Sequence, residues 1–308
     1  MRFHRTPVLA LLPLLLLSGC GRGGDIVAPS AEAANPEQAI VSAELAVHAD
    51  LIEDGLSEAR EQTAVDPAGA TPGAGVAAAI DPLFFWRDIR HVERAYEFAF
   101  GDTDGTGRPA SVVVTIHKRL SGWFNVVARQ DSPEGAPHEG RLVQKPLRDH
   151  WVRRVLLRRV VSSDARRRWR IAATSGVQIT ARDAETRLVS LRIRSGDLDT
   201  TLTDPLTLFR LRQVIRLQPE VEVALTATTL RNDDVVVLYR RDLRSRFRNN
   251  GDNTYSATWT AAALAGVGHF GVDALSHGTL FDDEAGYDSQ AWIIPYLVAP
   301  TELADLAS

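Results

Sequence analysis

The chain has 308 residues, and its 35 basic and 39 acidic side chains give a formal net charge of −4 at pH 7. This balance is not that of a nucleic-acid-binding protein, so we expect no nucleic-acid partner. Cys20 is the single cysteine, which excludes an internal disulfide.

Residues 1–19 have the three parts of an export signal. Arg2 and Arg5 give a positive start, and an apolar run follows over residues 6–17. That run is shorter than the roughly 20 residues that a membrane-spanning helix needs. It ends in Leu17-Ser18-Gly19-Cys20, which resembles the lipobox of bacterial lipoproteins.

The lipobox resemblance implies a lipid anchor. In that family the cysteine thiol receives a diacylglyceryl group, and the chain is cut before it, so Cys20 is the expected lipid-attachment residue and the membrane an expected partner. Gly21, rather than Asp, follows the cysteine, and this indicates the outer membrane of a cell envelope. The alternative is an ordinary secretory signal with an incidental cysteine.

Residues 20–81 are expected to form a tether. Asn35-Pro36-Glu37 is a typical helix start, and strong helix formers continue to about residue 62, which predicts one helix over 36–62. The Ala/Gly/Pro-rich segment 64–80 is a typical linker. A lone helix either separates the folded part from the lipid or packs on the domain after it, and the composition favours a spacer.

Residues 82–212 alternate in apolar character with period two, which predicts a middle antiparallel β domain in an all-β fold. The clearest runs are Tyr96, Phe98, Phe100; Val112, Val114, Ile116; and Val189, Leu191, Ile193.

The β domain contains a basic stretch over residues 141–170. Arg153, Arg154, Arg158 and Arg159 flank an apolar core in this stretch and are candidates for docking an anionic lipid headgroup or an acidic polysaccharide. The alternative is a solvated sheet face whose arginines pair with neighbouring acids. As a strand, residues 151–159 place Trp151, Arg153, Val155, Leu157 and Arg159 on one side, although a short helix also fits.

Two acidic loops have spacings compatible with calcium. Asp102 and Asp104 lie in an Asp/Gly-rich loop, and Asp282, Asp283 and Asp288 lie in a later one. A hairpin turn explains the first loop equally well, because Asp and Gly suit turn geometry. Apart from the lipid and this calcium, no cofactor is expected.

Residues 213–300 are predicted to fold as a β-sandwich, followed by a tail over 301–308. The segment 250–259 (NGDNTYSATW) resembles the immunoglobulin-like repeats of filamins and bacterial surface proteins. This resemblance implies a turn that feeds a strand in which Tyr255 and Trp259 are buried on one sheet face; Trp292 is expected in or beside the same core.

Two functions follow from these features. The first is a non-enzymatic envelope lipoprotein that binds a protein or a glycan, with no catalytic residue. The second is an envelope carbohydrate-active hydrolase, which would use a pair of carboxylates in the middle domain. Asp88, Glu93, Asp149 and Asp183 are the candidates, and no local context selects a pair.

Overall fold

The computed structural model describes residues 36–65, 79–129, 140–160, 168–241 and 243–299. The signal segment 1–19, Cys20 and the tail 301–308 lie outside these ranges. Strands predominate, and antiparallel sheets in a sandwich-like arrangement confirm the all-β prediction.

The larger sheet consists of β1 (Thr63–Ala64), β2 (Pro82–Phe100), β3 (Ser111–Arg129), β4 (Gly140–Arg159), β5 (Trp169–Ala181), β16 (Ser289–Val298), β15 (Gly266–Leu275), β11 (Val235–Tyr239) and β12 (Arg244–Arg246), with β8 (Phe209–Arg210) beside β5 and β9 (Ile215–Leu217) beside β16. The smaller sheet consists of β13 (Arg248–Asn249), β14 (Thr254–Thr260), β10 (Glu222–Thr229), β6 (Leu188–Ser195) and β7 (Leu198–Leu202). The helices are α1 (Pro36–Val47), α2 (Ala49–Ile52) and α3 (His277–Phe281), with a 3₁₀ turn at Leu211–Gln213.

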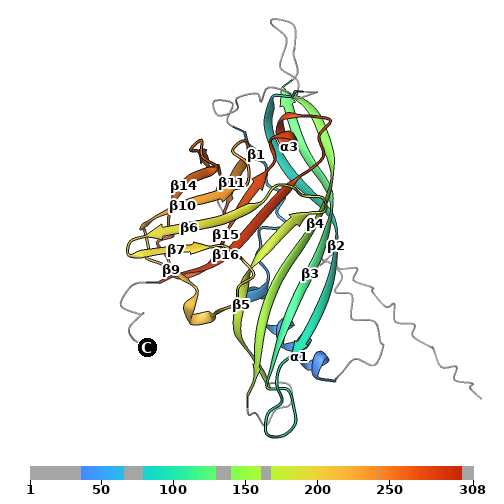
Figure 1. The fold of residues 1–308 in the computed structure, drawn as a ribbon, viewed down its shortest axis with the longest axis vertical. Helices are drawn as coiled ribbons and strands as arrows, with labels where there is room; N and C mark the ends of the chain where they lie inside the picture. The colour runs from blue at the N-terminus through green and yellow to red at the C-terminus, as the bar shows by residue number, and fades with distance from the viewer. Residues whose placement is uncertain (1–35, 66–78, 130–139, 161–167, 242, 300–308) are drawn as a thin grey trace, which may run out of the picture.

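Strands β2 to β5 form a long, curved antiparallel wall (Figure 1). Side chains alternate between a buried inner face and an outer face, most clearly along β4. The bend requires close contact between β2 and β3 at Gly122, where a Cβ would lie 1.9 Å from the carbonyl oxygen of Asp88. The β2 register shifts nearby, between Ile89 and His91, so a bulge and a glycine together bend the wall.

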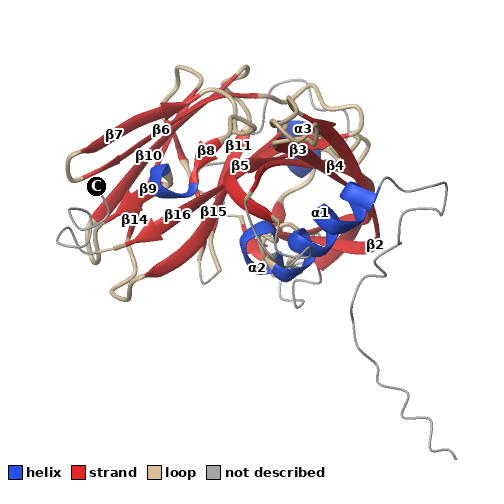
Figure 2. Ribbon diagram, turned by 90° about the horizontal axis from the view of Figure 1, so that it is seen from below, coloured by secondary structure: helices blue, strands red, loops and turns tan. Residues whose placement is uncertain are grey.

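The smaller sheet packs against β11, β15 and β16 as a sandwich. Trp292 and Phe270 from the larger sheet meet Tyr255 and Trp259 from the smaller one in a single apolar core. The opposite faces of β11, β15 and β16, including Ile293, belong to the core inside the curved wall. These three strands are therefore a shared layer between two cores, as Figure 2 shows from below.

This shared layer corrects the expected domain boundary at residues 212 and 213. The sandwich recruits β6 and β7 from the middle region, because β6 pairs with β10. In the other direction β16 pairs with β5 of the curved wall. The middle region and the sandwich are therefore joined through continuous pairing and do not separate at that point.

The N-terminal segment 36–65 corrects the expected spacer. The helix begins at Pro36 as predicted, but α1 ends at Val47 and α2 at Ile52, well before residue 62. Val41 and Leu45 are buried in the core of the curved wall, and Figure 2 shows α1 and α2 on its concave side. Of the two alternatives for a lone helix, packing is the one observed. The linker lies mostly in 66–78, outside the described residues.

The turn before β14 has the expected backbone. Gly251 has φ +90° and Asn253 has φ +65°, so Asn253 adopts the left-handed conformation that Asn tolerates better than most residues. Tyr255, Trp259 and Trp292 are 1%, 5% and 3% exposed, which confirms their predicted place in the core.

Candidate anion-binding site

The inner face of β4 carries three buried charges among apolar residues. Lys145, Asp149 and Arg153 are each less than 5% exposed and recur every fourth residue, so alternation directs all three into the core. Lys145 and Asp149 contact the segment that contains and follows α3, and Arg153 contacts the end of α2. Lys145 donates to the backbone oxygens of Gly278 and Asp282, Asp149 accepts from the Tyr287 hydroxyl, and Arg153 donates to the carbonyl of Ile52.

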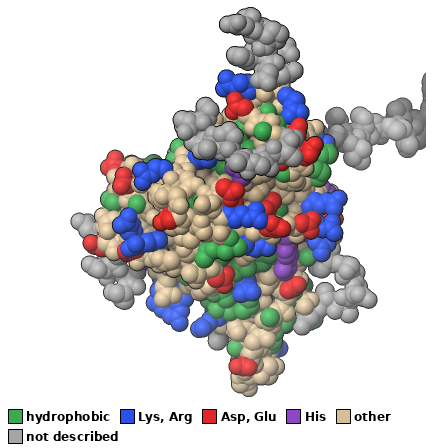
Figure 3. All heavy atoms as spheres, turned by 45° about the horizontal axis from the view of Figure 1, so that its top comes forward, with side chains coloured by type: hydrophobic (Ala, Val, Ile, Leu, Met, Phe, Trp, Pro, Cys, Tyr) green, Lys and Arg blue, Asp and Glu red, His purple; other side chains and the backbone are tan. Residues whose placement is uncertain are grey.

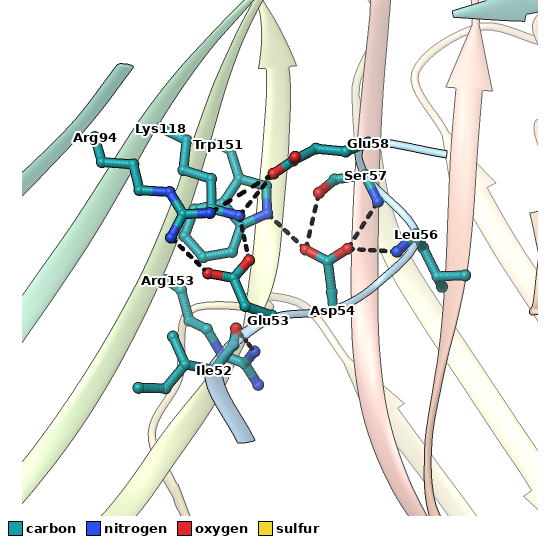
Figure 4. Close-up of polar contacts among 10 residues, drawn as sticks. All are labelled: Ile52, Glu53, Asp54, Leu56, Ser57, Glu58, Arg94, Lys118, Trp151 and Arg153. Atoms are coloured by element: carbon teal, nitrogen blue, oxygen red, sulfur yellow. Dashed lines mark hydrogen bonds and ion pairs between the residues drawn. The ribbon is translucent and has the colours of Figure 1, made fainter. Parts of the chain in front are cut away.

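The N-terminal segment is bound to this wall by its carboxylates (Figure 4). Glu53 accepts from the Lys118 ammonium at 2.6 Å and pairs with Arg94 at 2.8 Å. Glu58 lies 3.1 Å from Lys118, whose ammonium also sits 4.7 Å above the Trp151 ring. Acids on the segment thus neutralise bases on the inner face, where an unpaired charge would be costly.

Asp54 organises the turn that follows α2. Its carboxylate accepts from the backbone N–H groups of Leu56 and Ser57 and from the Trp151 indole (Figure 4). Burial acts to raise the pKa of Asp54, but these hydrogen bonds outweigh it, so the pKa lies below its ordinary value. The group is therefore ionised and serves the fold.

A second buried network joins the wall to the shared layer. The Arg87 guanidinium lies 2.7 Å from Asp273 and 3.8 Å from Asp149, and it donates to the hydroxyls of Tyr287 and Ser289. Burial is the main cause that raises the pKa of Asp149, to about 6; Arg87 opposes this and Asp273 adds to it.

The basic stretch divides between the two faces of β4. Arg153 is fully buried, and Arg159 pairs with Glu37 at 2.9 Å and stacks over Trp169. These two arginines cannot dock an external anion, which corrects half of the predicted cluster. The strand alternation predicted for residues 151–159 is observed. Arg153 faces inward, whereas Arg154 and Arg158 are exposed on the outer face.

The outer face contains an all-basic hollow around Arg158. It has a volume of about 440 Å³ and is lined by Leu156, Arg158, Ile171, Ala172, Arg210 and Arg212. The three arginines are exposed, and among the residues that the structure describes no acid lines the hollow. β8 pairs with β5 at Arg210 and Ala173, and this pairing brings Arg210 and Arg212 close to Arg158.

The sequence gives only a weak signal for two of these arginines. Arg210 and Arg212 alternate with apolar neighbours, which suggests a common side, but their proximity to Arg158 depends on a pairing between distant segments. No local pattern predicts that pairing. This part of the site was therefore missed.

Two larger hollows, separate from the basic one, have mixed charge. They measure about 690 and 610 Å³ and share Arg148 and Arg182. Glu93, Asp183, Glu185 and Asp233 also line them. Figure 3, which brings the top of the molecule forward, shows acidic, basic and histidine side chains intermixed on the face in view. Such a surface has no strong preference for an anion.

The acidic loops do not converge on a cation. Asp104 accepts from the N–H groups of Thr106 and Arg108 within a hairpin turn, which fits the turn alternative. The backbone carbonyl of Asp102 accepts from the N–H of Ala110. Asp288 accepts from the hydroxyl of Thr186.

The other two acids of the later loop are also engaged. Asp283 pairs with Arg141 at 2.7 Å, and Asp282 accepts from the N–H of Glu284. Within the described ranges, no group of three or more metal-ligating side chains is arranged to hold a metal ion.

Comparisons of the chain with protein families, with curated proteins and with solved structures find no match. In the part of the chain that the structure describes, no helix has the length and apolar character needed to cross a bilayer.

Proposed function

We propose that the chain is a lipid-anchored envelope lipoprotein without enzymatic activity, and that its folded part binds an acidic glycan in the all-basic hollow. The observation that carries this proposal is the grouping of Arg158, Arg210 and Arg212 around one hollow, whose described lining contains no acid. Three like charges repel one another, and a bound anion would relieve that repulsion.

The chemistry of the hollow favours a sugar that bears carboxylate or phosphate groups. Guanidinium groups bind both anions with paired hydrogen bonds. Leu156, Ile171 and Ala172 provide apolar surface between the arginines, against which the C–H groups of a sugar ring can pack. The proposed lipid on Cys20 would supply membrane attachment, because two or more acyl chains give a stable anchor.

The test compares two double variants of equal charge change. Arg158→Ser with Arg212→Ser should weaken binding to polygalacturonate, a carboxylated glycan, by about tenfold or more, as titration calorimetry would measure. Arg148→Ser with Arg182→Ser, in the mixed hollows, should change it little. Wild-type binding should weaken as salt rises, and neutral dextran should not bind. Equal losses in both double variants would contradict a specific site.

The second candidate function is a carbohydrate-active hydrolase of the envelope, and one observation favours it. Asp149 lines the mixed hollow of about 690 Å³ beside His150 and Ser121, and its raised pKa suits a general acid. Its contacts with Arg87 and Tyr287 also explain it as a structural group. Loss of glycan hydrolysis in Asp149→Asn, with wild-type hydrolysis present, would establish the enzyme instead.

A further inference from the structure

A small apolar cavity lies between α2, the wall and the shared layer, and among its lining residues it shares Ile171 with the proposed glycan site. It measures about 140 Å³, and its apolar walls include Leu51, Val155, Val214, Pro295 and Leu297. Val267 also lines it and is 62% exposed, so the cavity has a route to solvent. Two polar side chains that could recognise a ligand, Arg153 and His269, share this lining.

Arg153 brings a positive charge to this cavity without a directly paired acid. Its guanidinium donates to Ile52, Thr174 and Ser175, all of which are neutral acceptors. Across the residues that the structure describes, no carboxylate lies within 4.0 Å of it. Burial lowers the pKa of Arg153 to about 10, although the charges of Asp54 and Glu53 act in the opposite direction.

His269 adds a second unsatisfied group. Its Nε2 is buried and has no hydrogen-bond partner among the described residues. Burial, and then the charge of Arg153, lower its pKa to about 4, so the ring is neutral at pH 7. A neutral imidazole can present an N–H donor through one of its two ring nitrogens.

We infer that this cavity binds a small monocarboxylate with a compact apolar body. The carboxylate of the ligand would face Arg153 and accept a hydrogen bond from His269. It would thereby provide a counter-charge for Arg153 and a hydrogen-bond partner for His269. The apolar body would fill the space between Leu51, Val214 and Leu297. Burying an anion beside a buried cation is favourable only when hydrogen bonds also form, and both donors are present.

The volume of the cavity sets the size of the ligand. An engineered apolar cavity of about 150 Å³ accommodates benzene, which is close to the volume here. Benzoate therefore has a suitable body and charge, and it is the probe for the experiment. Benzyl alcohol has the same ring without the charge, and benzylamine has the opposite charge.

The experiment measures binding of the three probes to the purified full-length chain by titration calorimetry. Benzoate should bind with one-to-one stoichiometry, benzyl alcohol about tenfold or more weakly, and benzylamine not at all. Arg153→Met keeps an unbranched apolar stem and removes the charge, so it should abolish the preference for benzoate. Val214→Phe should block binding by filling the cavity without altering either polar group.

Val189→Phe is the matched control, because Val189 is an exposed valine of β6 outside the cavity. It should bind benzoate as wild type does. If Arg153→Met fails to fold, Val214→Phe and the comparison with benzyl alcohol still decide the question. Three results would each overturn the inference: no saturable benzoate binding, equal affinity for benzyl alcohol, or undiminished binding in folded Val214→Phe. Arg153 would then have a structural role, which is to hold α2 against the wall.

Discussion

The indole nitrogen of Trp151, in the middle of β4, donates a 2.8 Å hydrogen bond to Asp54 of the N-terminal segment, 97 residues away in sequence. Both side chains are buried. This bond ties the segment that follows the proposed lipid anchor into the core of the curved wall, so the segment contributes to stability as well as to length.

Asp54→Ala should lower the free energy of unfolding by roughly 2–4 kcal/mol, because four hydrogen-bond donors lose their acceptor. Urea denaturation measures this change. Asp199→Ala removes an exposed pair with Arg192 and should lower the free energy of unfolding far less, because exposed ion pairs contribute little.

The effect of Asp54→Ala should also depend on pH. The folded-state pKa lies below the ordinary value of 3.8, so this carboxylate stabilises the fold above that pH and stops doing so as pH falls through the folded-state pKa. Equal losses at pH 7 and well below 3.8 would contradict the assigned role of the ionised group.

The stability that Asp149 contributes should depend on pH in the opposite direction to that of Asp54, and Asp149→Asn tests this. The pKa of Asp149 is raised from 3.8 to about 6, so the folded protein binds this proton more tightly than the unfolded chain does. Stability relative to the variant is therefore greatest below 3.8 and declines as pH rises to about 6, by roughly 1–3 kcal/mol. Denaturation of both proteins between pH 4 and 7 measures the difference; a constant difference would contradict the raised pKa.

Trp259→Ala should cost roughly 3–5 kcal/mol, as truncation of a buried aromatic typically does. The ring packs against Phe270 with centroids 5.0 Å apart. Thermal or urea unfolding provides the measurement. Leu264, which is 83% exposed, is the control, and Leu264→Ala should change stability by less than about 0.5 kcal/mol. An unchanged midpoint for Trp259→Ala would mean that the sandwich core is assigned wrongly.

Cys20→Ser should yield a precursor that the lipoprotein peptidase does not cleave and that a fatty-acid probe does not label, because the thiol carries the lipid. Ser18→Ala keeps a small residue before the cysteine and should be processed normally. Electrophoretic mobility and metabolic labelling distinguish the forms. Normal processing of Cys20→Ser would refute the anchor.

Local pattern was sufficient to predict strand type and many buried faces. Alternation in residues 151–159 assigned Trp151, Arg153 and Val155 to one side, and the structure places all three inward. Pattern failed where distant segments decide the outcome. The helix near Leu45 looked like a spacer because the cations that bind its continuation, such as Lys118, lie on β3.

The same limit applies to the candidate sites. Arg158 was expected to face a ligand, but Arg210 joins it only through the β5–β8 pairing. Arg153 was a candidate for docking an anion, a role that requires an exposed guanidinium, and the structure buries it. The alternation of residues 151–159 predicted that Arg153 lies on the same side of the strand as Trp151 and Val155. Its neutral hydrogen-bond partners on α2 and β5 could not be predicted from residues 141–170.

The shared layer also has a consequence for strand alignment. In an amphipathic strand, slipping by one residue moves apolar side chains into water, which penalises the error. β16 is buried on both faces over residues 289–296, so its apolar pattern imposes little such penalty. Two polar residues at the start of β16 provide the penalty against a slip. Ser289 donates to Asp273 at 2.9 Å, and Gln290 accepts from the backbone N–H of Leu188 at 2.8 Å. Because these bonds point to opposite sides of the strand, a slip by one residue would break both and leave polar groups stranded in apolar surroundings.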